Sequence, residues 1–177
     1  MANTYNLIET VNVTSSVSTV VFSNIPQTYT DLVLCGSARG STTVVYASGF
    51  FRFNSQASGY DNRRMVAYYL DNGKSFSDSG FSGGIWGSAV QSSVNAANWF
   101  SPFWLYIPNY AGSQVKITGG DTSYQNTAIA DTFYLQTTAN RTGFTSAITS
   151  LTLLDATGGY GDTLQYSTFS LYGISKT

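Results

Sequence analysis

The side chains that most often carry catalysis are scarce in this sequence. Among its 177 residues there is no histidine, and there is a single cysteine, Cys35. Histidine is the usual general base and metal ligand, and a Ser-His-Asp or Cys-His arrangement cannot be built without it. Cys35 ends the apolar run Leu32–Cys35, which favours a buried, unreactive thiol. The residue types therefore disfavour nucleophilic and metal-assisted chemistry.

Carboxylate chemistry is the catalytic route that the composition leaves open. Nine acidic residues formally allow the carboxylate pair of a glycosidase. Six of them stand beside, or two positions from, Gly, Asn, Ser or Thr, where aspartate is favoured because its side chain bonds its own backbone in a turn. These six are Asp71, Asp78, Asp121, Asp131, Asp155 and Asp162. Asp155 and Asp162 flank a Gly-rich loop and offer oxygen ligands to Ca²⁺, but we expect turns, with no metal and no cofactor.

Composition also argues against several classes of partner. The net charge is −1 and the eight basic residues are scattered, whereas nucleic-acid binding needs several Lys or Arg side chains on one face. The Gly-rich segments 80–87 and 157–161 match neither the P-loop nor the dinucleotide-binding fingerprint. No apolar window is long enough for a membrane-spanning helix, and the amino terminus lacks the pattern of a secretory signal. We expect no nucleic-acid partner, no membrane and no secretion.

The elements that must position any site are predicted to be strands. Strong helix formers are scarce, and apolar residues alternate with polar ones in segments such as 30–36 and 167–174. About nine strands separated by turns predict one antiparallel β-sandwich or jelly-roll domain spanning residues 1–177. Asn72-Gly73 predicts a type I′ hairpin turn. The Gly- and Ser-rich stretch 77–98 predicts a long loop or a weak edge strand.

The aromatic content is the feature most suggestive of binding. Thirteen tyrosines exceed the needs of a core of this size, and only 10% of residues are charged. Tyrosine combines an apolar face with a polar tip and suits interfaces, so we favour contacts between protein subunits over stacking on sugar rings. Binding loops gather at Gly-rich ends of sandwiches, which points to residues 77–98 and 155–163. The candidate contact residues are Trp86, Phe81, Tyr160, Tyr110 and Trp99.

Four segments resemble a group of small virion structural proteins of tailed phages, of the type found on marine and cyanobacterial phages. The first segment carries an F-x-x-I-P-x-x-Y-x-D-L-x-L pattern, formed here by Phe22, Ile25, Pro26, Tyr29, Asp31, Leu32 and Leu34. The others are residues 51–65 around an R-F-N motif, the I-P-N-Y segment at 107–118, and the carboxy-terminal stretch 146–174. In the second, Asp61 and Asn62 follow Tyr60 rather than precede it. These residues are expected to specify architecture, with Tyr29 and Asp31 anchoring the start of a strand through hydrogen bonds.

The resemblance implies a β-sandwich virion protein without catalytic residues, placed on the capsid or in a tail fibre. Our first expectation is a non-enzymatic capsid decoration (cement) protein that binds and reinforces the shell of major capsid protein. Symmetric closure would hide the exposed sheet edges, so a homo-oligomer, and specifically a homotrimer, is expected. The alternative is a receptor-binding module of a tail fibre that recognises host surface polysaccharide.

Overall fold

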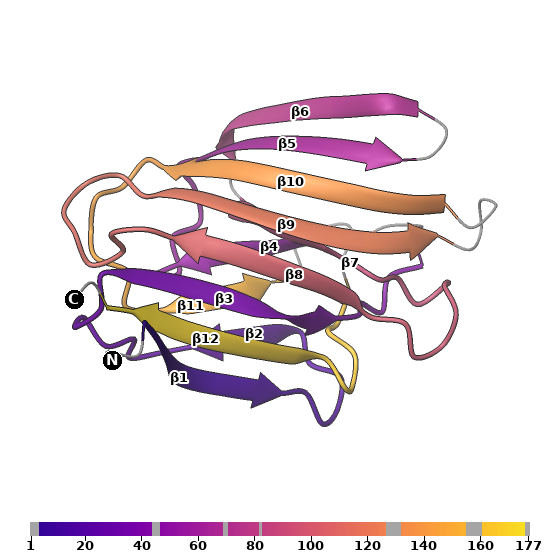
Figure 1. Cartoon of the computed structure of the whole chain (residues 1–177), viewed down its shortest axis with the longest axis horizontal. Helices are drawn as coiled ribbons and strands as arrows, with labels where there is room; N and C mark the ends of the chain where they lie inside the picture. The colour runs from indigo at the N-terminus through magenta and orange to yellow at the C-terminus, as the bar shows by residue number, and fades with distance from the viewer. Residues whose placement is uncertain are drawn as a thin grey trace.

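The structure is a computed structural model that describes residues 4–43, 47–68, 71–81, 83–126, 132–154 and 161–175. Within these residues the chain forms twelve β-strands and no helix. The strands make two antiparallel sheets, one of eight strands and one of four, which pack against each other (Figure 1). The predicted all-β antiparallel sandwich is confirmed.

The eight-stranded sheet has the order β1-β12-β3-β8-β9-β10-β5-β6, so strands from the two ends of the chain pair at one side. Its strands are β1 (Tyr5–Asn12), β3 (Asp31–Ala38), β5 (Tyr60–Tyr68), β6 (Asp71–Phe81), β8 (Ser101–Ile107), β9 (Ile117–Asn126), β10 (Thr132–Thr142) and β12 (Thr168–Ile174). The four-stranded sheet, behind it in Figure 1, has the order β2-β11-β4-β7. Its strands are β2 (Thr19–Phe22), β4 (Ala47–Phe53), β7 (Ile85–Val90) and β11 (Leu151–Leu154).

The main core lies between the sheets and follows the alternation of the strands. In β8 the side chains of Phe103, Leu105 and Ile107 are buried in this core, while Trp104 and Tyr106 point to the opposite side. Burying each large apolar side chain contributes roughly 1.5–3 kcal/mol, so the alternation decides which face of the sheet meets solvent. Trp104 is therefore held outward by the buried residues on either side of it.

On the inner side of β5, β9 and β10 the interior combines a small second apolar cluster, Val66, Tyr124 and Tyr134, with buried polar side chains. Asn62 and Asn140 are both buried there, and both bind the backbone of Trp86 in β7. The Asn62 carboxamide oxygen accepts a hydrogen bond from the Trp86 N–H at 3.3 Å, and the Asn140 amide donates to the Trp86 carbonyl at 3.0 Å. A buried polar group without a partner costs about 1–3 kcal/mol, so these bonds fix β7 against the larger sheet.

The predicted hairpin is present, but its turn lies elsewhere. Strands β5 and β6 pair with Tyr68 opposite Asp71, so the connection falls at 69–70, outside the described residues. Asn72 and Gly73 belong to β6 and coincide with a register shift between Val66 and Tyr68 of its partner. Gly73 has a φ of 81°. The positive φ that favours an Asn-Gly turn therefore serves a β-bulge here.

The stretch 77–98 contains the end of β6 and all of β7, which are edge strands of the two sheets. Of the two structures expected for this stretch, the edge strand is therefore confirmed for residues 77–81 and 85–90, and the long loop is wrong for those residues. Three aspartates predicted in turns also lie in strands: Asp71 and Asp78 in β6 and Asp121 in β9. Short polar side chains hide strand periodicity, because alternation is visible only when one face is apolar.

Candidate functional site

The residues behind the phage-protein resemblance meet at one corner of the sandwich. Asp31, only 4% exposed, begins β3, and its two carboxylate oxygens bind different groups of the β8 end. Oδ2 accepts a hydrogen bond from the Tyr106 hydroxyl at 2.8 Å, and Oδ1 accepts one from the backbone N–H of Asn109 at 2.8 Å. The predicted anchoring role of Asp31 is confirmed, and its partners come from the I-P-N-Y segment.

The other motif residues close the same corner. The Tyr110 hydroxyl donates to the carbonyl of Pro26, and Thr30 donates from both its N–H (2.8 Å) and its hydroxyl (2.7 Å) to the Ile174 carbonyl. The Tyr29 ring lies against Gly173, at a place where any Cβ would collide with it. Three of the four motif segments therefore meet at this corner. The fourth contacts the carboxy-terminal segment through Asn54, whose side chain donates to the Ala147 carbonyl at 2.7 Å and accepts from the Thr149 N–H at 2.8 Å. These contacts are architectural, and they assign the segments no reaction.

The Tyr106–Asp31 bond makes a prediction for alkaline pH. The hydrogen bond from the Tyr106 hydroxyl to the Asp31 carboxylate raises the pKa of Tyr106 from 10.0 to about 12, and burial is the second, smaller cause. Above pH 10 an unfolded chain loses this phenol proton while the folded chain keeps it, so the stabilisation is complete below about pH 10 and is lost as pH rises towards 12. Urea unfolding at several pH values should show the advantage of the wild type over Tyr106→Phe shrinking across this window. A constant difference would contradict the proton linkage.

One candidate surface is the outer face, defined as the side of the eight-stranded sheet that points away from the smaller sheet. Its exposed large apolar side chains are Tyr5, Leu7, Met65, Trp104, Ile117 and Leu135. The Trp104 and Tyr106 rings stack with centroids 5.9 Å apart and an interplanar angle of 7°. Next to Trp104 in the register lie Cys35 on β3 and Asp121 on β9. The same face carries the charged side chains Asp61, Arg63, Asp121 and Arg141, of which Arg141 and Asp61 form an ion pair. Exposed apolar side chains mixed with charges of both signs make this face a candidate protein-binding surface.

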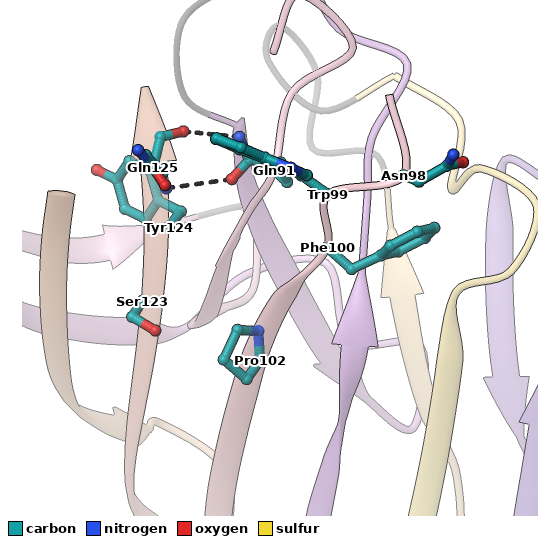
Figure 2. A pocket seen from close by; sticks show the side chains of 8 residues that line it. All are labelled: Gln91, Asn98, Trp99, Phe100, Pro102, Ser123, Tyr124 and Gln125. Atoms are coloured by element: carbon teal, nitrogen blue, oxygen red, sulfur yellow. Dashed lines mark hydrogen bonds between the residues drawn. The ribbon is translucent and has the colours of Figure 1, made fainter. Parts of the chain in front are cut away.

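A second candidate is a pocket of about 370 Å³ at the end of the sandwich where β8 begins. One wall is the loop after β7, which carries Gln91 and Trp99, and the other is the end of β9 with Tyr124 and Gln125. Figure 2 shows these side chains and the two hydrogen bonds that join the walls. The Gln91 amide donates to the Gln125 carbonyl at 2.7 Å, and the Gln125 N–H donates back to the Gln91 side chain at 3.2 Å.

The five predicted contact residues have different fates. Trp99 is 38% exposed and lines the pocket. Tyr110 is 0% exposed, so the expectation that it contacts a partner is wrong. Its ring packs in the core, and its hydroxyl donates to the Pro26 carbonyl. Trp86 is half-buried, packed between the Phe50 ring at 4.5 Å and the Arg64 guanidinium at 3.8 Å. Tyr160 and the side chain of Phe81 lie outside the described residues.

Trp104 is the residue that sequence reasoning missed. The signal was present in the segment 99–107, where Trp104 alternates with the apolar residues that fill the core. The aromatic run on both sides concealed that alternation.

The described acids form no metal site. Among the described residues there is no group of three or more Asp, Glu, Cys or His side chains that could hold a metal ion. Asp155 lies outside the described residues, so the possible Asp155–Asp162 calcium site is not tested. In the described part of the chain no helix is long and apolar enough to cross a membrane.

Comparisons with known proteins add no relative from which a role could be transferred. No protein-family model, no curated protein and no solved structure matches the chain. The likeness to phage virion proteins therefore rests on the four motif segments themselves, and the candidate surfaces must be judged by their own chemistry.

Proposed function

We propose that this chain is a non-enzymatic structural protein of a tailed-phage particle, which decorates the capsid by binding the major capsid protein through its outer face. The observation that carries the proposal is the set of exposed apolar and aromatic side chains on the outer face of the eight-stranded sheet. The motif resemblance supplies the kind of particle. The absence of histidine, together with the structural use of Asp31, supports a role without catalysis.

The size of the outer face suits a stable protein contact. Eight strands of 7 to 11 residues, spaced about 4.8 Å apart and rising about 3.4 Å per residue, give a surface of roughly 1,200 Å². A standard protein interface takes about 800 Å² from each partner. Exposed Met65, at 65%, and Trp104, at 40%, offer the kind of side chains that are enriched at the centre of such contacts. A face of this area can therefore bind one protein partner without a cleft.

The edges of the same sheet are less suited to binding. The pairing of β1 shifts register between Leu7 and Glu9, and the pairing of β6 shifts register twice. Bulges at an edge twist the strand and hinder the addition of another strand. Exposed Lys74 on β6 adds a charge that also opposes edge pairing. The geometry therefore favours docking through the face, and the expected homotrimer would have to leave that face free for the capsid.

Copy number on purified particles tests the proposal. Quantitative mass spectrometry of phage particles that carry this chain should find it on the order of hundreds of times per particle, because a decoration protein follows the repeated capsid lattice. A count of a few dozen or fewer would overturn the decoration role and support the tail-fibre alternative. Soluble protein should leave phage adsorption to host cells unchanged, whereas a tail-fibre adhesin would compete with it.

A matched pair of tryptophan variants tests the surface. Trp104→Ala should reduce the bound copies by about tenfold or more, as loss of a central aromatic contact does in other interfaces. Trp99→Ala, which removes an equally exposed ring elsewhere, should leave the copy number unchanged. Cys35 gives an independent readout, because a thiol reagent should label the partly exposed side chain more slowly on particles than on free protein. Equal labelling in both states would exclude the outer face.

A further inference from the structure

The loop that leads to Trp99 is joined to the segment 39–42 by several hydrogen bonds. The Arg39 guanidinium donates to the carbonyls of Ser93 (3.2 Å) and Asn95 (3.0 Å). The Ser93 hydroxyl donates to the Thr42 carbonyl at 2.7 Å, and the Gly40 N–H donates to the Gln91 carbonyl at 2.8 Å. These bonds hold residues 91–95, and the N–H of Trp99 itself donates to the Ala96 carbonyl at 3.4 Å. Restricting the loop in this way lowers the entropic cost of binding a ligand at Trp99.

The opposite wall is equally fixed. Tyr124 is buried and its ring stacks on Tyr134 of the neighbouring strand, with centroids 4.6 Å apart and an interplanar angle of 5°. The paired hydrogen bonds between Gln91 and Gln125 tie this wall to the Trp99 loop. The pocket is thus formed before any ligand arrives, as small-molecule sites usually are.

The chemistry of the lining indicates an uncharged, hydroxyl-rich ligand. The side chains that line the pocket include no charged group. An exposed indole offers a flat apolar surface, while Asn98, Ser123 and Gln125 place amide and hydroxyl groups at the rim. A sugar ring matches both features of this lining. Its C–H face can stack on the indole, and its hydroxyl groups can form hydrogen bonds with the amides. At about 370 Å³ the pocket lies near the lower end of the roughly 300–1,000 Å³ range of ligand sites, which fits a short segment of a glycan.

We infer that the pocket between Trp99 and the end of β9 is a binding site for an uncharged saccharide. Trp99 stacks on the sugar ring, and the rim amides hydrogen-bond to its hydroxyl groups. The inference does not depend on the capsid-binding proposal, because Trp104 does not line this pocket, although Pro102 and Ser123 of its lining lie beside Trp104 on the outer face. A capsid decoration protein with this site would also attach its particle to neutral glycans, and a tail-fibre module would use the site for its host.

The test is binding of immobilised neutral oligosaccharides built from glucose, galactose, mannose or N-acetylglucosamine, followed by calorimetry on those that bind. Wild-type protein should bind at least one of them, and Trp99→Ala should weaken that binding by about tenfold or more. Trp99→Phe keeps an aromatic ring and should retain part of the affinity. The matched control is Trp104→Ala, which removes a ring of nearly equal exposure and should bind the sugar as the wild type does.

Three outcomes would overturn the inference. One is a Trp99→Ala variant, shown to be folded by an unchanged thermal midpoint, that binds the sugar like the wild type. Another is the absence of binding to every neutral glycan at millimolar concentration, and the third is a preference for sialylated or sulfated glycans over neutral ones. None of these results bears on copy number or on the effect of Trp104→Ala, so failure of the saccharide site and failure of the decoration role are distinguishable.

Discussion

Replacing Asp31 with alanine is expected to lower the free energy of unfolding by about 3 kcal/mol. The carboxylate is 4% exposed and accepts hydrogen bonds from the Tyr106 hydroxyl and the Asn109 N–H, both at 2.8 Å. Alanine would leave both donors without their charged partner in a corner that admits little water. The free energy should be measured by urea unfolding at neutral pH, followed by tryptophan fluorescence.

Two milder variants separate the hydrogen bonds from the shape of the side chain. Asp31→Asn keeps the size and retains an oxygen for the Asn109 N–H, so it should cost about half as much as alanine. Tyr106→Phe removes only one of the two donors and should also fall between wild type and Asp31→Ala. A loss within about 0.5 kcal/mol for Asp31→Ala, as is typical of plain surface positions, would show that the corner does not anchor β3.

The contacts of Asp31 show which parts of this fold local sequence patterns could predict and which they could not. That Asp31 anchors the start of a strand follows from a short polar residue placed directly before an apolar run. Its partner Asn109 lies 78 residues away, and no local pattern encodes which loop closes on which strand. Tyr110 was misassigned for the same reason, because an aromatic residue in a turn resembles a binding residue until its hydroxyl finds the Pro26 carbonyl.

The strands β6 and β7 were predicted only in part for another reason, because alternation can be recognised in a sequence only where one face of the strand is apolar. Strand β6 and the middle of β7 contain Ser and Gly at positions where other strands carry Val or Leu. Their pairing comes from backbone hydrogen bonds and from buried amides such as Asn62 and Asn140. Trp99 could be proposed from the sequence as an aromatic residue in a loop, but its pocket could not, since β9 supplies the facing wall.

Two adjacent glycines in β9 are expected to respond in opposite ways to alanine. A Cβ at Gly120 would lie closer than 3.0 Å to the carbonyl oxygen of Trp104 and 3.3 Å from the Leu105 Cα, both backbone atoms of β8. Backbone cannot turn aside as a side chain can, so β8 and β9 would have to separate. Gly120→Ala should therefore lower the free energy of unfolding by about 2–3 kcal/mol.

Gly119 is the matched control, because it is adjacent to Gly120 in the same strand and a side chain added there would lie on the outer face. A Cβ there would find its nearest neighbour, the Thr138 carbonyl oxygen, at 3.7 Å, which is ordinary contact. Gly119→Ala should leave stability unchanged or raise it by up to about 1 kcal/mol, since alanine restricts the unfolded chain more than glycine does. Urea unfolding of both variants measures the difference, and equal losses would show that β8 and β9 do not approach as closely as this. Because the same close approach sets the position of Trp104, Gly120→Ala should also weaken binding through the outer face, whereas Gly119→Ala adds only a methyl group beside Tyr106.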